Sequence, residues 1–290
     1  IKDNLKTFLS QQDEFTDYNF EGSGMNILLD ILAYNTHYLG YNANMLANEM
    51  YLDSADQRSS VVSLAKQVGY TPRSSTSSQA TIDVVVNNAS GASLTMSRGT
   101  KFTTTVDGTN YSFVNNADVS ISPQDGVYKF SNLNIFEGTY LNYKYTANTS
   151  DKDQRFIIPN DFVDTGTLTV KVQESSSDST TNTYKLATGI TALDSTSKVY
   201  FLQEVENGRY EVYFGDDVIG QSIKDGNIVI LDYITCNLDE PNGASTFTLS
   251  GTVGGFANVT ITTLGNAANG SGPETIKSIK YNAPRDYTSQ

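Results

Sequence analysis

The residues with the clearest potential for chemistry are a single histidine and two pairs of neighbouring carboxylates. His37 is the one histidine of the chain, so a Ser-His-Asp triad would have to be built on it, within a helical pattern. Asp216-Asp217 and Asp239-Glu240 have the residue types of a glycosidase acid and base, but adjacent strand residues face opposite ways. Gly215 and Pro241 beside them indicate turns. We therefore expect no enzymatic activity and keep a hydrolase as the weaker alternative.

The sequence also lacks the residue groups that hold metals and cofactors. Cys236 is the single cysteine, which excludes an internal disulfide and a cysteine-based zinc cluster. Gly22-Ser23-Gly24 precedes a helical pattern, as in some anion sites, but no strand signal comes before it and no lysine follows it directly. This tripeptide fits a hinge at a helix start. No P-loop or EF-hand loop is present, so we expect no cofactor and no metal site.

Charge limits the possible partners. The 19 basic and 32 acidic residues give a net charge of −13. A chain without a basic surplus does not neutralise phosphates, so we expect neither nucleic acid nor a membrane as a partner. No stretch approaches the roughly 18 apolar residues of a membrane span. The first residue is Ile1 rather than Met, from which we expect a piece of a longer protein. Other proteins are then the expected partners.

A periodic stretch from Met25 to Met50 predicts a long helix with two apolar seams. Both seams follow the alternating four-three spacing of a packed helix, and they lie on opposite sides. The first seam contains Met25, Leu29, Leu32, Leu39, Leu46 and Met50, with Thr36 and Ala43 between them. The second seam contains Ile27, Ile31, Tyr34, Tyr38, Tyr41 and Met45. We predict that these seam residues bind partners.

The next helix is too short to cover both seams. Ser54 is the expected cap of a helix that runs to about Val68. At 1.5 Å per residue this helix is roughly 21 Å long, against roughly 39 Å for the first. The uncovered part needs either the β region of this chain, in ordinary core packing, or another chain. Asn35, Asn42 and Asn44 near the seams are expected to fix the register of a bundle.

The rest of the chain follows the period-two pattern of strands. Ile82, Val84 and Val86 alternate with other residues, as in a strand with one buried face. Asp107-Gly108 and Asn207-Gly208 separate strand-like runs and predict hairpin turns, and Asp225-Gly226 predicts another. Residues 174–183 are rich in Ser, Thr and Asp and indicate a loop or hairpin tip. From about 80 to 264 we therefore expect a mostly antiparallel β region.

A helix is expected near the end of the sequence. Ser271-Gly272-Pro273-Glu274 matches a capping box with proline in the first turn. The helix is predicted to run toward Tyr281, and Pro284 to end it.

Together these patterns predict an α+β protein, with an N-terminal long-helix hairpin followed by mostly antiparallel β domains. The expected parts are a helical bundle-forming segment at 1–75, a β domain at 76–150, a second β domain at 151–235, and β strands at 236–290 that lead into a further α/β domain that is cut off. The break between the two β domains is expected near 150.

Three groups of motifs resemble phage tail proteins. Residues 21–35 (EGSGMNILLDILAYN), 48–55 (NEMYLDSA) and Arg58 resemble the N-terminal region of the large baseplate wedge subunit of T-even-like contractile-tailed phages. The motifs RGTKF (98–102), YSF (111–113) and FGD (214–216), with Gly220, Gly226 and Tyr233, are similar to the baseplate J-like family. GSGPETI (270–276) and NAPR (282–285) look like the glycine-rich turn, helix and Ala-Pro element of that family.

The resemblance implies a structural virion protein of the tail baseplate, assembled in the host cytoplasm. Its implied partners are another copy of itself and neighbouring baseplate wedge subunits, which together join wedges into a ring around the tail hub. Helical bundling would then cover the two seams. The main alternative is an extracellular adhesin or receptor-binding tail protein, which fits the acidity and the Thr and Asn content. The helix with two apolar faces favours the wedge subunit.

Overall fold

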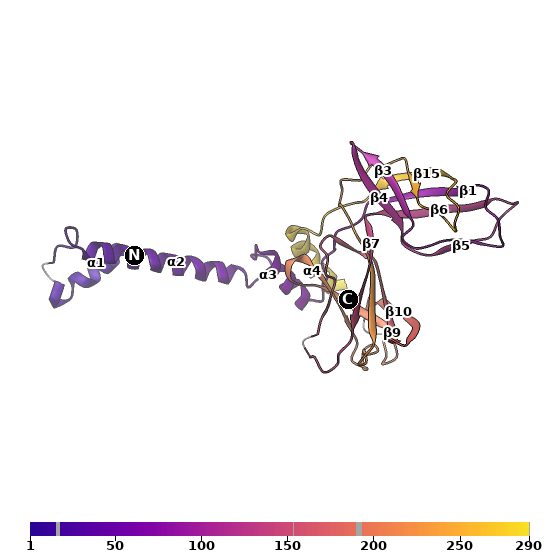
Figure 1. Ribbon diagram of the computed structural model, residues 1–290. Helices are drawn as coiled ribbons and strands as arrows, with labels where there is room; N and C mark the ends of the chain where they lie inside the picture. The colour runs from indigo at the N-terminus through magenta and orange to yellow at the C-terminus, as the bar shows by residue number, and fades with distance from the viewer. Residues whose placement is uncertain (16–17, 153, 190–192, 290) are drawn as a thin grey trace. The chain divides into compact units, whose positions relative to one another are not determined.

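The computed structural model describes residues 1–15, 18–152, 154–189 and 193–289 and divides into two compact units (Figure 1). The helical unit comprises Ile1–Gly69 and Lys280–Gln290, and the β unit comprises Tyr70–Ile279. The helices precede mostly antiparallel sheets, which confirms the α+β class. Among the described residues, no helix combines the length and the hydropathy needed to cross a membrane.

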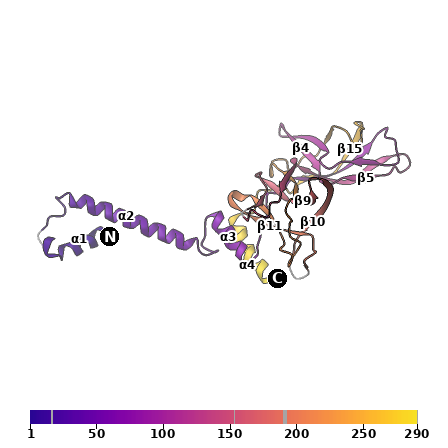
Figure 2. The ribbon, with the colours of Figure 1, turned by 60° about the horizontal axis from the view of Figure 1, so that its bottom comes forward.

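The helical unit is built around one long helix, α2, with α1 packed against it (Figure 2). Lys2 Nζ lies 2.6 Å from Asp30 Oδ1, whereas Lys6 pairs with Glu21, so the two helices run antiparallel. The helices are α1 (Lys2–Ser10), the short 3-10 helix η1 (Asp13–Phe15), α2 (Met25–Asn48), α3 (Arg58–Gln67) and α4 (Ile276–Ser289). The long helix predicted from the apolar spacing is thus confirmed.

The second predicted helix begins later than expected. Ser54 does not cap it, because the Ser54 hydroxyl donates to the Asn48 carbonyl at 2.6 Å and closes the turn after α2. α3 begins at Arg58, and the Glu49 carboxylate accepts a hydrogen bond from the Asp56 backbone N–H at 2.9 Å just before it. An acceptor from the end of α2 therefore serves the start of α3, which local spacing does not reveal.

The first sheet of the β unit has six antiparallel strands in the order β14-β3-β4-β6-β1-β15. On β1, Ile82, Val84 and Val86 are buried and alternate with partly exposed residues, as the period-two pattern predicts. They share a core with Phe102 and Phe113. The strands are β1 (Gln79–Val86), β3 (Lys101–Val106), β4 (Thr109–Asn115), β6 (Tyr128–Glu137), β14 (Thr248–Ser250) and β15 (Val259–Ala268), and a separate pair is β2 (Leu94–Met96) with β5 (Val119–Ile121).

The second sheet has seven strands in the order β7-β13-β9-β10-β11-β12-β8 and is rolled, because side chains of its first and last strands meet. The Tyr145 hydroxyl of β7 donates to the Ile157 carbonyl of β8 at 2.5 Å, and the Tyr145 ring packs edge-on against Phe156. Tyr184, Tyr210 and Tyr233 fill the core of this sheet. Its strands are β7 (Thr139–Thr146), β8 (Phe156–Ile157), β9 (Val163–Ser175), β10 (Asp178–Leu186), β11 (Val199–Glu204), β12 (Tyr210–Phe214) and β13 (Ile228–Thr235).

The turn signals place the hairpins correctly. Asp107 and Gly108 have φ angles of 49° and 82° and join β3 to β4, with Val106 paired to Thr109. Asn207 also has a positive φ, in the connection between β11 and β12. β9 and β10 form a hairpin whose tip lies within the tract 174–183. Residues that tolerate positive φ thus mark these turns in the sequence.

The chain passes from the first sheet to the second at Gly138, earlier than the break expected near 150. Gly138 has a φ of +128°, and a Cβ there would lie 2.1 Å from the Thr235 carbonyl oxygen, so only glycine fits. The polar residues near 150 form a loop after β7. β14 and β15, from the last expected part, return to the first sheet. The four-part division itself stays a prediction.

The expected end of the last helix is wrong. α4 continues past Pro284 to Ser289. Proline removes one helix hydrogen bond, but Ile279 and Ala283 are fully buried, and this packing holds the helix together. The expected capping box is also absent: the Thr275 hydroxyl oxygen accepts from the Ser278 backbone N–H at 3.3 Å.

Candidate partner-binding surface

The two seams predicted on α2 are largely exposed in the structure. Ile27, Tyr34 and Leu39 are 62–65% exposed, and Leu46 is 70% exposed. We call the exposed residues of both seams together the α2 surface, and they are Ile27, Ile31, Leu32, Tyr34, Tyr38, Leu39, Tyr41, Met45, Leu46 and Met50. Large exposed apolar areas on soluble proteins mark interaction sites. The partner-binding role of these residues stays a prediction.

The remaining two seam residues lie at the end of α2 against which α1 packs. Leu29 is 2% exposed and Met25 is half-buried. The Lys2–Asp30 ion pair joins α1 to the same part of α2. Leu29 is therefore a core residue of the helical unit, and the exposed seam positions are the ones available to a partner.

The α2 surface carries almost no charge. Asp30 is the one charged residue of Met25–Asn48, and it is paired with Lys2. The polar residues near the seams are the exposed asparagines Asn35, Asn42 and Asn44. On a chain with a net charge of −13, this neutral surface is a place where two copies can meet with little electrostatic repulsion.

Gly40 in the middle of α2 has no local reason to be glycine. A Cβ at this position would meet no atom within 4 Å, and glycine costs about 1 kcal/mol relative to alanine inside a helix. Ala33, Ala43 and Ala47 lie near it at helical spacing. Small residues in one strip leave room for another backbone to approach closely, which is consistent with a partner helix over α2.

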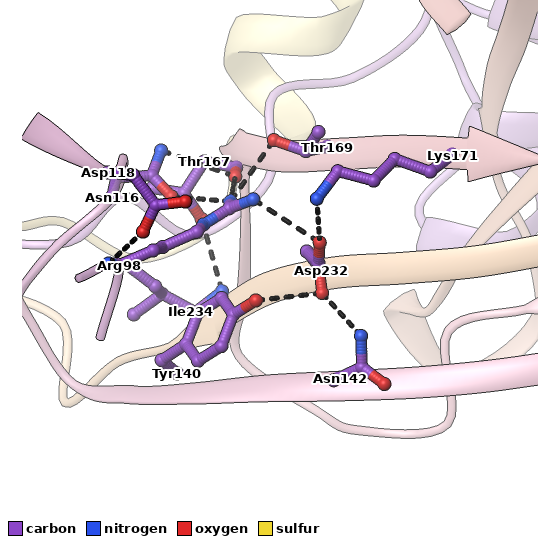
Figure 3. A network of polar contacts seen from close by, with 10 residues as sticks. All are labelled: Arg98, Asn116, Asp118, Tyr140, Asn142, Thr167, Thr169, Lys171, Asp232 and Ile234. Carbon is purple, nitrogen blue, oxygen red and sulfur yellow. Dashed lines mark hydrogen bonds and ion pairs between the residues drawn. The ribbon is translucent and has the colours of Figure 1, made fainter. Parts of the chain in front are cut away.

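A second candidate is a buried polar network that joins the two sheets of the β unit (Figure 3). Arg98 comes from the loop before β3, and Asp232 comes from β13. Arg98 Nη1 lies 3.4 Å from Asp232 Oδ2, and Arg98 Nη2 donates to Asn116 Oδ1 at 2.6 Å and to Thr169 Oγ1 at 3.1 Å. The side chain of Asp232 is only 3% exposed.

Asp232 is surrounded by donors from the second sheet. The Tyr140 hydroxyl donates to it at 2.8 Å and Asn142 Nδ2 at 2.5 Å, while Lys171 Nζ lies 3.1 Å away. Burial acts to raise the pKa of Asp232, but the hydrogen bonds from Asn142, Tyr140 and Lys171 outweigh it, so the pKa lies below its usual value. Burial and donation to this carboxylate raise the pKa of Tyr140 to about 12. The network thus holds an ionised carboxylate with partners at both oxygens, while the buried Arg98 Nε has no hydrogen-bond partner among the described residues.

Sequence reasoning did not identify this network. Arg98 was noted within the RGTKF motif, but its partner lies far away in the sequence. A usable signal exists in β13, where Asp232 interrupts the apolar run of Ile228–Thr235. A carboxylate within a buried strand must be paired, so this position alone predicts a hidden cation or several donors.

The residues first considered for chemistry, which are His37 and the pairs Asp216-Asp217 and Asp239-Glu240, are exposed in the structure. His37 is exposed on α2. Asp216 accepts from the backbone N–H of Ile219 at 3.0 Å, and Asp217 accepts from the Ser222 hydroxyl at 2.6 Å. These hydrogen bonds lower the pKa of both carboxylates and fix the loop. In the part of the chain that the structure describes, no group of three or more His, Cys, Asp or Glu could hold a metal ion.

The helical unit is similar to a known protein family. Residues 1–70 match the family described as baseplate wedge protein gp6-like, helical domain. The match covers the region that contains α1, α2 and α3, and therefore the whole α2 surface.

Comparison with curated proteins extends the similarity to the β unit. The chain is 30% identical, over an alignment of 310 positions, to baseplate wedge protein gp6 of Enterobacteria phage T4. The alignment covers 97% of this chain and 45% of the relative, so the chain spans just under half the length of the protein it matches. Both comparisons show that this chain is similar to baseplate wedge proteins.

Proposed function

We propose that this chain is a structural, non-enzymatic subunit of a phage tail baseplate wedge in the virion, and that it joins wedges into a ring around the tail hub. The observation that carries this proposal is the 30% identity, across 97% of the chain, to a protein named baseplate wedge protein gp6. We further assign the chain to the baseplate J-like family. The RGTKF and FGD motifs at 98–102 and 214–216 support that finer assignment.

We propose that the α2 surface is the assembly contact, and that it bundles with another copy of this chain and with neighbouring wedge subunits. Its large side chains are more than two-fifths exposed, from Met45 at 43% to Leu46 at 70%. Full burial of a large apolar side chain contributes roughly 1.5–3 kcal/mol, and covering the exposed part of several such side chains together supplies the association energy. Asn35, Asn42 and Asn44 would fix the register of the bundle.

The absence of charge on α2 favours a second copy as one of the partners. Two acidic chains repel each other at most surfaces, but Asp30 is the sole charged residue of α2 and Lys2 pairs with it. Gly40 leaves space for close backbone approach at the middle of the same helix. Hydrophobic burial can then act with little opposing electrostatic cost.

The test replaces two exposed residues of the α2 surface in the full chain. Leu32 and Leu39 are 53% and 62% exposed, so Leu32→Asp with Leu39→Asp should leave the fold of the monomer intact. Light scattering coupled to size exclusion, over a range of concentrations, should show an oligomer for the original chain and a monomer for the double variant. Each buried carboxylate at a contact carries a large desolvation cost.

A matched control introduces the same charges elsewhere. Val218 and Leu264 are exposed residues of the β unit, and Val218→Asp with Leu264→Asp should leave the oligomer unchanged. The proposed contact is wrong if both double variants associate like the original chain. It is also wrong if both lose association to the same extent, since charge alone would then explain the result.

A second experiment tests the wedge partners. The chain is co-expressed with the neighbouring wedge subunits of its own phage, with and without the Leu32→Asp and Leu39→Asp changes. A stable complex that the α2 changes remove is expected. An adhesin would instead bind glycans on an array and would ignore the α2 changes, which separates it from a wedge subunit.

A further inference from the structure

The chain enters and leaves the β unit through two segments that lie side by side. The incoming segment is 70–77 and the outgoing segment is 270–278. The Thr76 backbone N–H donates to the Ser271 carbonyl at 2.9 Å, and the Ser271 N–H donates back to Thr76 at 3.0 Å. Arg73 Nη1 adds a hydrogen bond to the Ser271 hydroxyl oxygen at 2.8 Å. The two segments are therefore paired directly.

Glu274 fastens the same two segments through its side chain. Its carboxylate is buried, at 4% exposure, and accepts from the Tyr70 hydroxyl at 2.8 Å and from the Arg73 backbone N–H at 3.0 Å. The Glu274 N–H donates to the Arg73 carbonyl at 2.9 Å, and the Ser278 hydroxyl donates to the carboxylate at 2.5 Å. One buried carboxylate thus receives donors from the incoming segment and from the first turn of α4.

The incoming segment is also fixed to the second sheet. The Tyr210 hydroxyl of β12 donates to the Pro72 carbonyl at 2.9 Å, and the Thr71 hydroxyl donates to the Leu202 carbonyl at 3.0 Å. The segment around Glu274 therefore pairs with a chain that is itself held by the sheet.

We propose that Glu274 closes a latch between the incoming and outgoing segments of the β unit, so that the two segments open and close together. α4 begins at Ile276 on this latch and continues past Lys280, where the helical unit resumes. Opening of the latch frees residues 70–76 and the first turn of α4 together. This inference rests on contacts within the β unit and does not depend on the proposed assembly role.

The Tyr70 hydroxyl, the Arg73 N–H and the Ser278 hydroxyl each donate to the Glu274 carboxylate, which suits an acceptor-only side chain. Glu274→Gln keeps the size of the side chain but removes its negative charge, so the one remaining oxygen accepts neutral hydrogen bonds in place of charge-assisted ones from Tyr70 and Arg73. Charge-assisted hydrogen bonds are roughly twice as strong as neutral ones, so the loss of the charge weakens the contacts between the two segments. The variant should favour the open latch without removing any apolar packing.

Limited proteolysis of the full chain measures this opening. Trypsin cleaves after Arg73, and Ser74 beside it is 3% exposed and protected while the latch is closed. When opening is fast, native-state cleavage follows the population of the open form. Glu274→Gln should therefore raise cleavage after Arg73 and after Lys277 together, by about tenfold. Glu206→Gln, a change at an exposed loop residue, is the matched control and should cleave at the original rate.

Hydrogen exchange separates latch opening from general destabilisation. In Glu274→Gln the amides of 70–76 and 276–279 should exchange faster, while those of β13 keep their original protection. Tyr70→Phe removes one donor without a change of charge, so the exchange rates of the same segments should rise less. This variant tests the latch if Glu274→Gln does not fold. Unchanged cleavage after Arg73, or an equal loss of protection in β13, would overturn the proposal.

Discussion

The α2 surface and the Asp232 network both depart from the usual distribution of side chains. The first exposes apolar residues, and the second buries charged ones. α2 exposes large apolar residues such as Leu39 and Leu46, whereas the β unit buries the charges of Arg98 and Asp232 between its sheets. In the network both oxygens of the Asp232 carboxylate have donors or cations beside them. The helical unit leaves its apolar surface uncovered. The β unit thus neutralises its buried charge internally, whereas α2 exposes the apolar surface for which we propose a partner.

The largest expected effect comes from removing the buried carboxylate of Asp232. Asp232→Ala leaves Arg98, Lys171 and Tyr140 without their shared acceptor, so we expect the free energy of unfolding to fall by about 3–5 kcal/mol. Urea denaturation measures it. Asp30→Ala on α2 is the matched change, because the side chain of Asp30 is 56% exposed, and it should cost less than about 1 kcal/mol. Similar losses in both variants would contradict the contrast.

The pH dependence of unfolding sharpens the comparison at both ends of the scale. Asp232 has a lowered pKa in the folded chain, so its stabilisation is present above the unfolded pKa of about 4 and is lost as the pH falls. Tyr140 has its pKa raised to about 12, so its stabilisation is present below about 10 and is lost as the pH rises toward 12. Urea unfolding across this range should show both losses.

Tyr140→Phe is the control for the alkaline side. This variant removes the titrating hydroxyl but keeps the ring under Arg98, so the stability should be lower at neutral pH and flatter between pH 10 and 12. If the free energy of unfolding of this variant still fell as steeply between pH 10 and 12, other tyrosines would be responsible for the loss of stability.

The smallest expected effect concerns Gly40 and has opposite signs for folding and association. Gly40→Ala should stabilise α2 in the monomer by up to about 1 kcal/mol, because alanine favours helix and open space surrounds the position. The added methyl group should weaken association if a partner backbone approaches there. Thermal unfolding of dilute protein and light scattering of concentrated protein measure the two effects. Gly24→Ala, at the helix start, should leave association unchanged.

Local signals account for what could be predicted from the sequence. The four-three spacing over 25–50 and the positive-φ pairs Asp107-Gly108 and Asn207-Gly208 concern residues close in the chain, and the structure places a helix and two hairpins there. The seams were predicted from the same spacing, but Leu29 lies under α1, whose weakly apolar sequence gave no helix prediction.

Pairings over long sequence distances account for what was missed. Arg98 meets Asp232 and Glu274 meets Tyr70 only after the sheets have formed, so no spacing rule links them. The same reason explains the wrong capping box, since Glu274 matched the local pattern but accepts from the incoming segment instead. Pro284 was predicted to end α4 because its cost is local, whereas the burial of Ile279 and Ala283 that offsets it is not.

The return of β15 to the first sheet has a consequence for how the protein is made. Val84 of β1 pairs with Ile261 of β15, so the edge of this sheet is completed only after about 180 further residues have been synthesised. At about 5–20 residues per second this delay is roughly ten to forty seconds. During that time the apolar α2 has already left the ribosome. Nascent chains on one messenger therefore carry exposed α2 helices close together, and prompt capture by a partner would protect them from aggregation.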